Sequence, residues 1–368
     1  MWQRPQQFLS RLSVRHPILF VEEPAPVEGL SEPRALLREI AELPNILVLR
    51  TEFPPAIMGQ RALLDAEQKR LVQEVIARQL PPTFEQPVQW FYDPMATTSF
   101  VGSMNERAIV YDCMDQLSQF RGAPPELVRR EAELLTKADV VFAGGPKIHK
   151  AKRVLNANCH SYGCGVDVPH FGQARAAETV VPAEVAKLEG PVLGFFGVVD
   201  ERMDYELLSF VAQARPNWNL VIIGPTAKVD PQALPQHPNL HWLGGRDYAQ
   251  LPAYVKGFDI CLMPFAMNEA TEFINPTKAL EYMATGRPIV STPVEDVVLQ
   301  FSEVVHLATT PDEFLAACEQ ILQTPDQARI KRGLAMAEEN TWEAIVAEME
   351  EHIATCLAKR EEQTEQVA

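Results

Sequence analysis

The feature that most constrains the fold is a regular alternation of short apolar runs with helical segments. The runs are rich in β-branched and aromatic residues and occupy 17–23, 45–50, 88–93, 108–113, 139–145, 191–197, 219–224, 239–244, 259–265, 288–292 and 304–308. They are nearly continuous rather than alternating, as expected for strands covered on both faces. Segments with helical periodicity lie between them, at 57–79, 124–137, 203–214, 247–256 and 311–323. This order predicts an α/β fold with two doubly wound parallel sheets.

The chain length agrees with two domains, because 368 residues are too many for a single hydrophobic core. We place the first Rossmann-like domain at 1–171 and a small, polar, weakly periodic linker at 172–190. The second domain follows at 191–340. A helix with a frayed tail is expected at 341–368.

The net charge of −16 is unevenly distributed, since residues 171–368 carry 14 Lys and Arg against 29 Asp and Glu. An acidic half argues against nucleic acid as a partner, because phosphates require a basic face. The near-neutral first part contains a local basic cluster: Arg129, Arg130, Lys137, Lys147, Lys150, Lys152 and Arg153. This cluster has two interpretations, a solvated helix face or a contact with a membrane surface or an anionic acceptor.

No apolar run reaches the roughly 18 residues of a membrane-spanning helix, and the first residues lack the apolar core of a signal peptide. We therefore expect a cytoplasmic protein, with peripheral contact at the inner face of the membrane through the N-terminal domain as a further expectation. The six cysteines include no C-x-x-C pair. They are expected to be reduced and mostly buried, and no metal site is expected.

The segment 273–292, FINPTKALEYMATGRPIVST, combines features of an anion site. Asn275 is a favoured helix N-cap residue and Pro276 suits the first helical position. The free N–H groups of the first turn and Lys278 would attract a phosphate. Glu281, one turn further on the same face, could accept hydrogen bonds from sugar hydroxyls. The residues alone fit equally well with a surface Lys–Glu pair.

This segment resembles the nucleotide-sugar-binding segment of GT-B glycosyltransferases, in particular the family 4 type of bacterial surface and capsular polysaccharide synthesis. Similar stretches occur in the same order at 2–12, 20–24, 110–120, 131–145, 165–171, 194–208, 220–225 and 258–265. The resemblance implies two Rossmann-like domains facing across a crevice, with a C-terminal helix crossing back. It implies a nucleoside diphosphate sugar donor (UDP or GDP), a glycan or lipid-linked acceptor, retention of configuration, and no metal or cofactor.

Carried over to this sequence, the resemblance assigns donor-binding residues. Lys278 and Arg202 become a diphosphate clamp, and Glu281 becomes the contact to the ribose. The remaining donor-binding candidates are Gly197, Gly224, Arg246, Glu272, Asn275, Pro276 and Thr277. From the residues alone, Arg202 could instead pair with a neighbouring surface acid, and Arg246 could point into water.

The sequence departs from the family pattern in the donor segment. Val198 occupies the position of an arginine that follows Gly197 in relatives. The first glutamate of the family pair would fall on Phe273, with Glu272 adjacent to it. The donor sugar is therefore left open.

On the acceptor side, Asp112 and Asp115 follow the apolar run at 108–113. We expect them to face the crevice, where a carboxylate could bind an acceptor hydroxyl or assist proton transfer. Capping of the following turn is the alternative for both residues.

In relatives a strand precedes the position of Trp2, so we expect the first strand of the acceptor domain to be absent from this sequence, which leaves the activity of the chain open. Two alternatives to a glycosyltransferase are kept. One is a non-catalytic GT-B binding subunit, and the other is a UDP-sugar epimerase.

Overall fold

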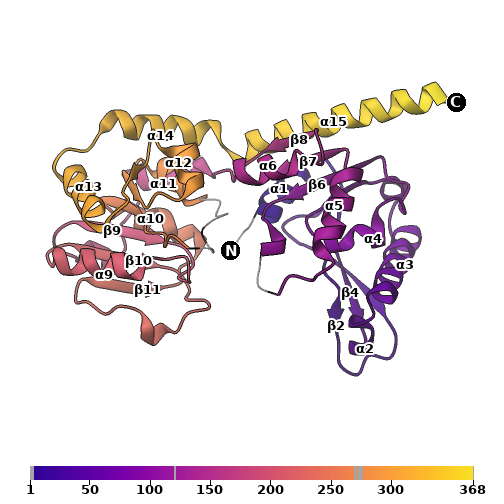
Figure 1. Cartoon of the computed structure of the whole chain (residues 1–368), viewed down its shortest axis with the longest axis horizontal. Coiled ribbons are helices and arrows are strands. Elements are labelled where there is room, and N and C mark those ends of the chain that lie inside the picture. Colours follow the sequence, from indigo (N-terminus) through magenta and orange to yellow (C-terminus); the bar gives the residue numbers. More distant parts are fainter. Residues whose placement is uncertain (1–3, 120–121, 269–270, 272–276, 368) are drawn as a thin grey trace. The chain divides into compact units, whose positions relative to one another are not determined.

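A computed structural model describes residues 4–119, 122–268, 271 and 277–367 of the chain. It forms two compact units, one made of residues 163–344 and the other of residues 2–162 together with 345–368 (Figure 1). Both units contain parallel sheets flanked by helices. This confirms the α/β class with two Rossmann-like parts.

The unit 163–344 is built on a sheet of six parallel strands in the order β11-β10-β9-β12-β13-β14. The order reverses between β9 and β12, as in doubly wound sheets. The strands are β9 (Val192–Phe196), β10 (Asn219–Ile223), β11 (Leu240–Gly244), β12 (Ile260–Met263), β13 (Ile289–Ser291) and β14 (His306–Leu307).

Alternate residues of these strands enter two different cores, because successive side chains of a strand point to opposite faces. On one face Phe196 and Ile223 pack with residues of the helices 168–172, 251–256, 277–285 and 295–301. On the other face Phe195 and Ile222 pack with residues of the helices 205–214 and 311–323. The two cores explain why the strands read as continuous apolar runs.

The helices of this unit lie between and after its strands. They are α7 (Val168–Gly172), α8 (Ala183–Ala186), α9 (Tyr205–Ala214), α10 (Leu251–Lys256), α11 (Thr277–Thr285), α12 (Glu295–Phe301), α13 (Pro311–Gln323) and α14 (Gln327–Glu339). The segment 172–190, expected as a linker, lies inside this unit. Its Val185 is buried and belongs to the core with Val255 and Phe258. These apolar contacts hold the segment against α10.

The second unit contains two four-stranded sheets. In one, β4 pairs in parallel with β1 and β2 and antiparallel with β3; in the other, the parallel strands follow the order β5-β6-β7-β8. The strands are β1 (Ile18–Val21), β2 (Ala25–Pro26), β3 (Arg34–Glu39), β4 (Ile46–Phe53), β5 (Val88–Phe91), β6 (Ala108–Cys113), β7 (Val140–Ala143) and β8 (Cys159–Ser161). Side chains of both sheets, such as Leu49 and Ile109, share one core.

The helices of the second unit come from both ends of the sequence. They are α1 (Arg4–Leu12), α2 (Pro55–Met58), α3 (Arg61–Gln79), α4 (Thr97–Phe100), α5 (Leu127–Lys137), α6 (Pro146–Lys152) and α15 (Trp342–Val367). The first residues of α15 belong to the unit 163–344 and the rest to the second unit. The helix therefore crosses back, as the family resemblance implies.

Two local expectations are corrected. The antiparallel strand β3 has no counterpart among the predicted runs, because it alternates exposed and half-buried residues instead of forming a continuous apolar run. The tail expected to fray is helical to Val367. The expectation that the cysteines are mostly buried is confirmed, since five are buried and Cys164 is half-buried.

Candidate functional site

Two glycines lie at the carboxyl ends of neighbouring strands of the unit 163–344. Gly197 follows β9 and Gly224 follows β10, with φ angles of 156° and 153°. The Gly197 N–H donates to the Ile223 carbonyl at 2.8 Å, and the Gly224 N–H donates to the Gly244 carbonyl at 2.9 Å. A Cβ atom at position 224 would lie 1.6 Å from the Gly197 carbonyl oxygen. The backbones approach so closely that only glycine fits at position 224.

The first turn of α11 carries the Lys278–Glu281 pair. Lys278 Nζ lies 3.0 Å from Glu281 Oε2, and their side chains are 13% and 15% exposed. Glu281 Oε2 is nevertheless buried without a hydrogen bond of acceptable angle to any described residue. The two charges attract each other, but this carboxylate oxygen still lacks a well-aligned donor. Buried oxygens of this kind are uncommon and favour a ligand donor.

The Lys278 side chain lies against the end of β9. Its Nζ is 5.1 Å from the centre of the Phe196 ring, a cation–π contact. A Cβ atom at position 197 would be 3.3 Å from Lys278 Cε. The hydroxyl of Tyr282 accepts a hydrogen bond from the Phe196 N–H at 3.0 Å. The structure therefore brings Gly197, Lys278 and Glu281 together at the carboxyl end of this sheet.

Arg202, the other half of the predicted clamp, is held by Asp200. Its Nη2 and Nε lie 2.6 and 2.9 Å from the two Asp200 carboxylate oxygens. Asp200 is almost fully buried, whereas the Arg202 side chain is 40% exposed. The pairing is the alternative that the sequence left open, and it also fixes the guanidinium at the surface.

Arg246 serves the packing of its own unit. Its guanidinium pairs with Glu184 at 3.0 Å and donates to the hydroxyl of Tyr254 at 2.7 Å and the Leu243 carbonyl at 2.6 Å. The side chain neither points into water nor lies free to meet a nucleotide. A role in donor binding would require these contacts to be exchanged.

Residues 272–276 lie outside the described residues, and they include Glu272, Phe273, Asn275 and Pro276. Thr277 is the first residue of α11 and is half-buried. The helix ends at Gly286, whose positive φ of 72° is typical of a residue that terminates a helix.

Asp112 does not face a crevice, which corrects the sequence-based expectation. It is fully buried in β6, and its carboxylate receives hydrogen bonds from Arg4 Nη2 and Nε at 2.8 and 3.1 Å. Arg4 also donates to the Tyr162 carbonyl at 2.6 Å. Burial raises the pKa of Asp112 and the Arg4 guanidinium lowers it. The pair fixes α1 to the sheet, so the Asp112 carboxylate is part of a structural ion pair.

Asp115 lies half-buried in the turn after β6, where its carbonyl accepts a hydrogen bond from the Leu117 N–H at 3.0 Å. Asp93 after β5 caps a short 3₁₀ turn by accepting the Met95 N–H at 2.8 Å. Burial raises the pKa of Asp93. The acceptor role expected for Asp115 stays a prediction.

Sequence reasoning missed Arg4 and Phe196. Arg4 is 108 residues from Asp112, so no local spacing could connect them. Phe196 was read only as part of an apolar strand. Its place directly before Gly197 was a usable signal, because a strand-end aromatic ring can face a cation on the neighbouring helix.

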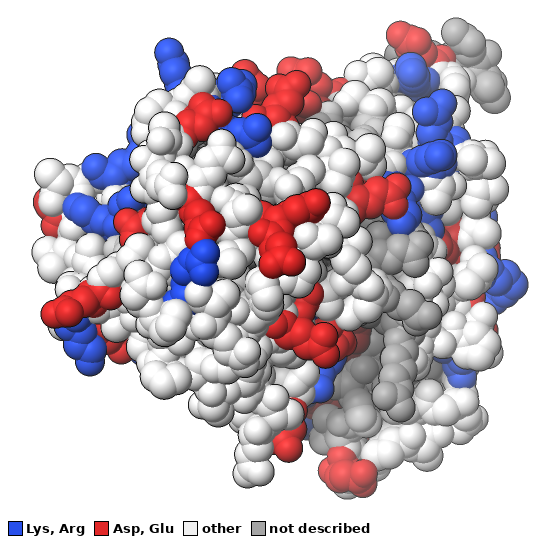
Figure 2. Space-filling model, turned by 60° about the vertical axis from the view of Figure 1, so that its left-hand side comes forward, with Lys and Arg blue, Asp and Glu red and all other residues white. Residues whose placement is uncertain are grey.

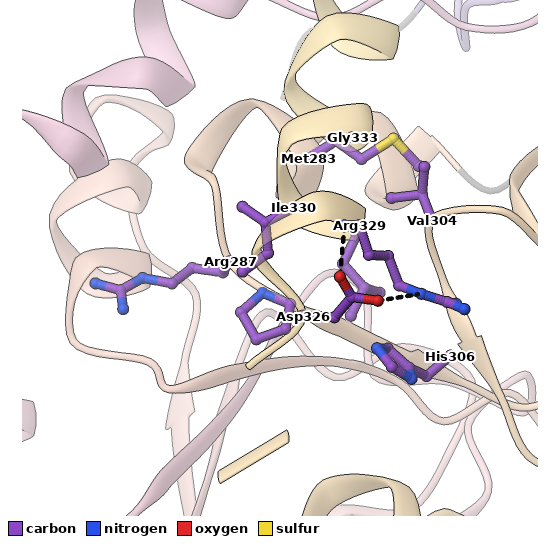
Figure 3. Close-up of a pocket in the computed structure, with 10 residues that line it drawn as sticks. Met283, Arg287, Val304, His306, Asp326, Arg329, Ile330 and Gly333 are labelled. Atoms are coloured by element: carbon purple, nitrogen blue, oxygen red, sulfur yellow. Dashed lines mark hydrogen bonds and ion pairs between the residues drawn. The ribbon is translucent and has the colours of Figure 1, made fainter. Parts of the chain in front are cut away.

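A small pocket of the same unit lies away from these residues, between α14 and the ends of β13 and β14 (Figure 3). Asp326 and Arg329, three residues apart at the start of α14, pair at 3.8 Å, and His306 lies near them. Burial lowers the pKa of His306. None of the predicted donor-binding residues lines this pocket.

Three further observations concern metal ions, membrane-spanning helices and surface charge. Among the residues that the structure describes, no group of three or more His, Cys, Asp and Glu side chains is placed to hold a metal ion. No described helix is long and apolar enough to cross a membrane. Acidic side chains form several clusters on the face drawn in Figure 2.

Comparisons with known proteins agree with this geometry. Residues 190–324, which contain every predicted donor-binding residue, match the family model "Glycosyl transferases group 1". The chain is 28% identical over 265 residues to a putative teichuronic acid biosynthesis glycosyltransferase, TuaH, of Bacillus subtilis. That match covers 64% of this chain and 64% of the relative.

Two solved structures have a similar fold. A structure from E. coli described as trehalose-6-phosphate bound with UDP-2-fluoro glucose has a TM-score of 0.66 at 14% identity, covering 95% of each chain. A trehalose-6-phosphate synthase studied for glycosyl transfer with retention has a TM-score of 0.65 at 15% identity, covering 96% of each chain. Residues 190–324 therefore match the glycosyl transferases group 1 model, and the chain has the GT-B fold of these structures.

Proposed function

We propose that the protein transfers a sugar from a nucleoside diphosphate sugar to a hydroxyl of a glycan or lipid-linked acceptor. The donor would bind to the unit 163–344. The observation that carries this proposal is the Lys278–Glu281 pair, in which a buried carboxylate oxygen lies beside a lysine and accepts no hydrogen bond from a described residue. A donor sugar would supply a hydroxyl as hydrogen-bond donor to Glu281 and a phosphate as a second anionic partner for Lys278.

Departure of the diphosphate is the demanding part of the reaction, because negative charge accumulates on it in the transition state. Lys278 and the N–H groups at the start of α11 would stabilise that charge in place, without reorganising at the moment of reaction. The bond between the anomeric carbon and the diphosphate oxygen breaks while the acceptor oxygen bonds to the same carbon. The acceptor proton would pass to the leaving phosphate.

Arg202 is the second cation proposed to contact the diphosphate. Asp200 holds its guanidinium with hydrogen bonds of 2.6 and 2.9 Å while leaving the side chain 40% exposed. A phosphate would approach the exposed part of this side chain while Asp200 keeps its pair with the guanidinium. Asp200 would keep the guanidinium in one orientation, which lowers the entropy lost on binding.

Retention without a metal or cofactor is also part of the proposal. It rests on the family resemblance and on the fold shared with a synthase studied for transfer with retention. UDP is the first nucleotide to test, since a second structure of this fold is bound with UDP-2-fluoro glucose. A surface polysaccharide or its lipid-linked precursor is the proposed acceptor, because the relative TuaH is named for teichuronic acid biosynthesis.

The proposal is tested by incubating the protein with a panel of UDP and GDP sugars and measuring slow release of free sugar in the absence of acceptor. We expect one donor to be hydrolysed, and Lys278→Ala to lower its rate. Lys331→Ala serves as the matched control, because Lys331 is an exposed lysine on α14 of the same unit. Binding of a nucleotide without any hydrolysis or transfer would favour a non-catalytic binding subunit instead.

A further inference from the structure

The structure divides the basic cluster of the second unit into paired and unpaired residues. Arg130 and Lys152 are buried and form ion pairs with Asp65 and Glu131 at 2.8 and 2.7 Å. Arg129 and Lys137 are exposed, and both pair with Glu133. The sequence alone could not show which of these residues are paired, because all of them carry the same formal charge.

Lys150 and Arg153 differ from the four paired residues. Both are exposed, and neither forms an ion pair or side-chain hydrogen bond with another described residue. Two exposed apolar side chains follow them directly, Val154 with 81% and Leu155 with 49% exposure. We call residues 150–155 the basic–apolar turn. It comprises the last three residues of α6 and the three residues that follow, ahead of β8.

The exposure of this turn is fixed by its own hydrogen bonds. The Leu155 and Asn156 N–H groups donate to the Lys152 carbonyl at 3.0 and 3.2 Å. The Asn156 amide donates to the carbonyls of Leu135 and Ala138 at 2.8 and 2.7 Å. The turn is thus anchored to the end of α5, and the two apolar side chains are held in water instead of folding back onto the unit.

We propose that the basic–apolar turn docks on the surface of an anionic lipid bilayer. Anionic headgroups would pair with Lys150 and Arg153, while Val154 and Leu155 would enter the boundary between headgroups and acyl chains. A net charge of −16 repels an anionic surface, so an unpaired cationic turn would decide which face approaches it. Nucleic acid would use the cations and leave Val154 and Leu155 in water, so a bilayer fits the turn better.

This proposal goes beyond the proposed function and does not depend on the donor site. Docking by the second unit would bring a lipid-linked acceptor and the chain to the same surface. The inference concerns the turn alone, and it holds or fails whatever nucleotide the other unit binds.

The test is flotation of the full chain with vesicles of phosphatidylcholine containing about 30% phosphatidylglycerol, compared with phosphatidylcholine alone. We expect binding to the anionic vesicles only. The double substitution Lys150→Gln with Arg153→Gln should weaken binding about 30-fold, since each cation contributes about five-fold near such a surface. Val154→Ser with Leu155→Ser should weaken it about ten-fold.

The matched control is Arg129→Gln with Lys137→Gln, which removes the same charge from the same unit at residues paired with Glu133. We expect the control to float like the wild type. Equal losses in the control and the turn variant, or full binding by the turn variant, would overturn the proposal. So would equal binding to both kinds of vesicle. Nucleotide titration of each variant reports separately on the donor site.

Discussion

Two charged pairs at the carboxyl ends of parallel strands show how similar residues take different roles. In the second unit, Arg4 and Asp112 form a pair with 4% and 0% side-chain exposure, and three hydrogen bonds join them. In the unit 163–344, Lys278 and Glu281 are 13% and 15% exposed and are joined by one contact, and within the described part of the chain Glu281 Oε2 accepts no hydrogen bond. A saturated pair stabilises a fold, whereas an incompletely satisfied pair can accept a ligand.

The largest expected effect is on the saturated pair. Arg4→Ala should lower the free energy of unfolding by about 3–5 kcal/mol, because it leaves the buried Asp112 carboxylate without its partner. Arg15→Ala, which removes the exposed pair with Glu350, should cost about 1 kcal/mol or less. Chemical denaturation of both variants measures the difference. Equal losses of unfolding free energy in both variants would show that the Arg4–Asp112 pair does not stabilise the fold.

The close approach of the strand-end loops predicts a smaller loss of stability. Gly224→Ala should lower the free energy of unfolding by about 3 kcal/mol, since its Cβ would meet the Gly197 carbonyl and its φ is positive. Gly245→Ala is the control, because the nearest atom there is 3.9 Å away. Denaturation midpoints that move equally in both variants would contradict the packing argument.

A smaller effect is expected at Arg202, and it concerns nucleotide binding and not stability. Arg202→Ala should weaken nucleoside diphosphate binding about ten-fold, because one exposed cation of the proposed clamp is lost. Lys228→Ala, in the exposed pair with Glu201, should leave binding unchanged. Calorimetric titration distinguishes these outcomes. Unchanged affinity in the Arg202 variant would reduce its role to the pairing with Asp200.

The smallest effect concerns pH and the second unit. Burial, His352 and His149 lower the pKa of His160, whose ring stacks on that of His352 at 3.7 Å. The unfolded state therefore binds the proton more tightly, and stability should fall as the pH decreases below about 6.5 towards the lowered pKa. Denaturation at about pH 7 and pH 5 should show a smaller decrease for His160→Gln than for the wild type. An equal decrease would exclude His160 as the cause.

Much of the fold could be predicted from the sequence, because buried parallel strands require continuous apolar runs. The runs at 191–197 and 219–224 became β9 and β10 with nearly the predicted bounds. The pairing of Lys278 with Glu281 could be predicted too, since residues three apart on a helix share a face. What failed depended on contacts distant in sequence. Asp112 was expected to face a crevice because nothing near it indicated Arg4, and β3 was missed because its pairing with β4 leaves one face in water.

The most direct test of the central claim is calorimetric titration of UDP and GDP into the wild type, Lys278→Ala and the control Lys331→Ala. If the unit 163–344 binds a nucleoside diphosphate through Lys278, one nucleotide should bind to the wild type and to the control. Lys278→Ala should weaken that binding by about 10- to 100-fold, the contribution of one charge-assisted hydrogen bond. Failure of both nucleotides to bind, or equal affinity in Lys278→Ala and the wild type, would contradict the account.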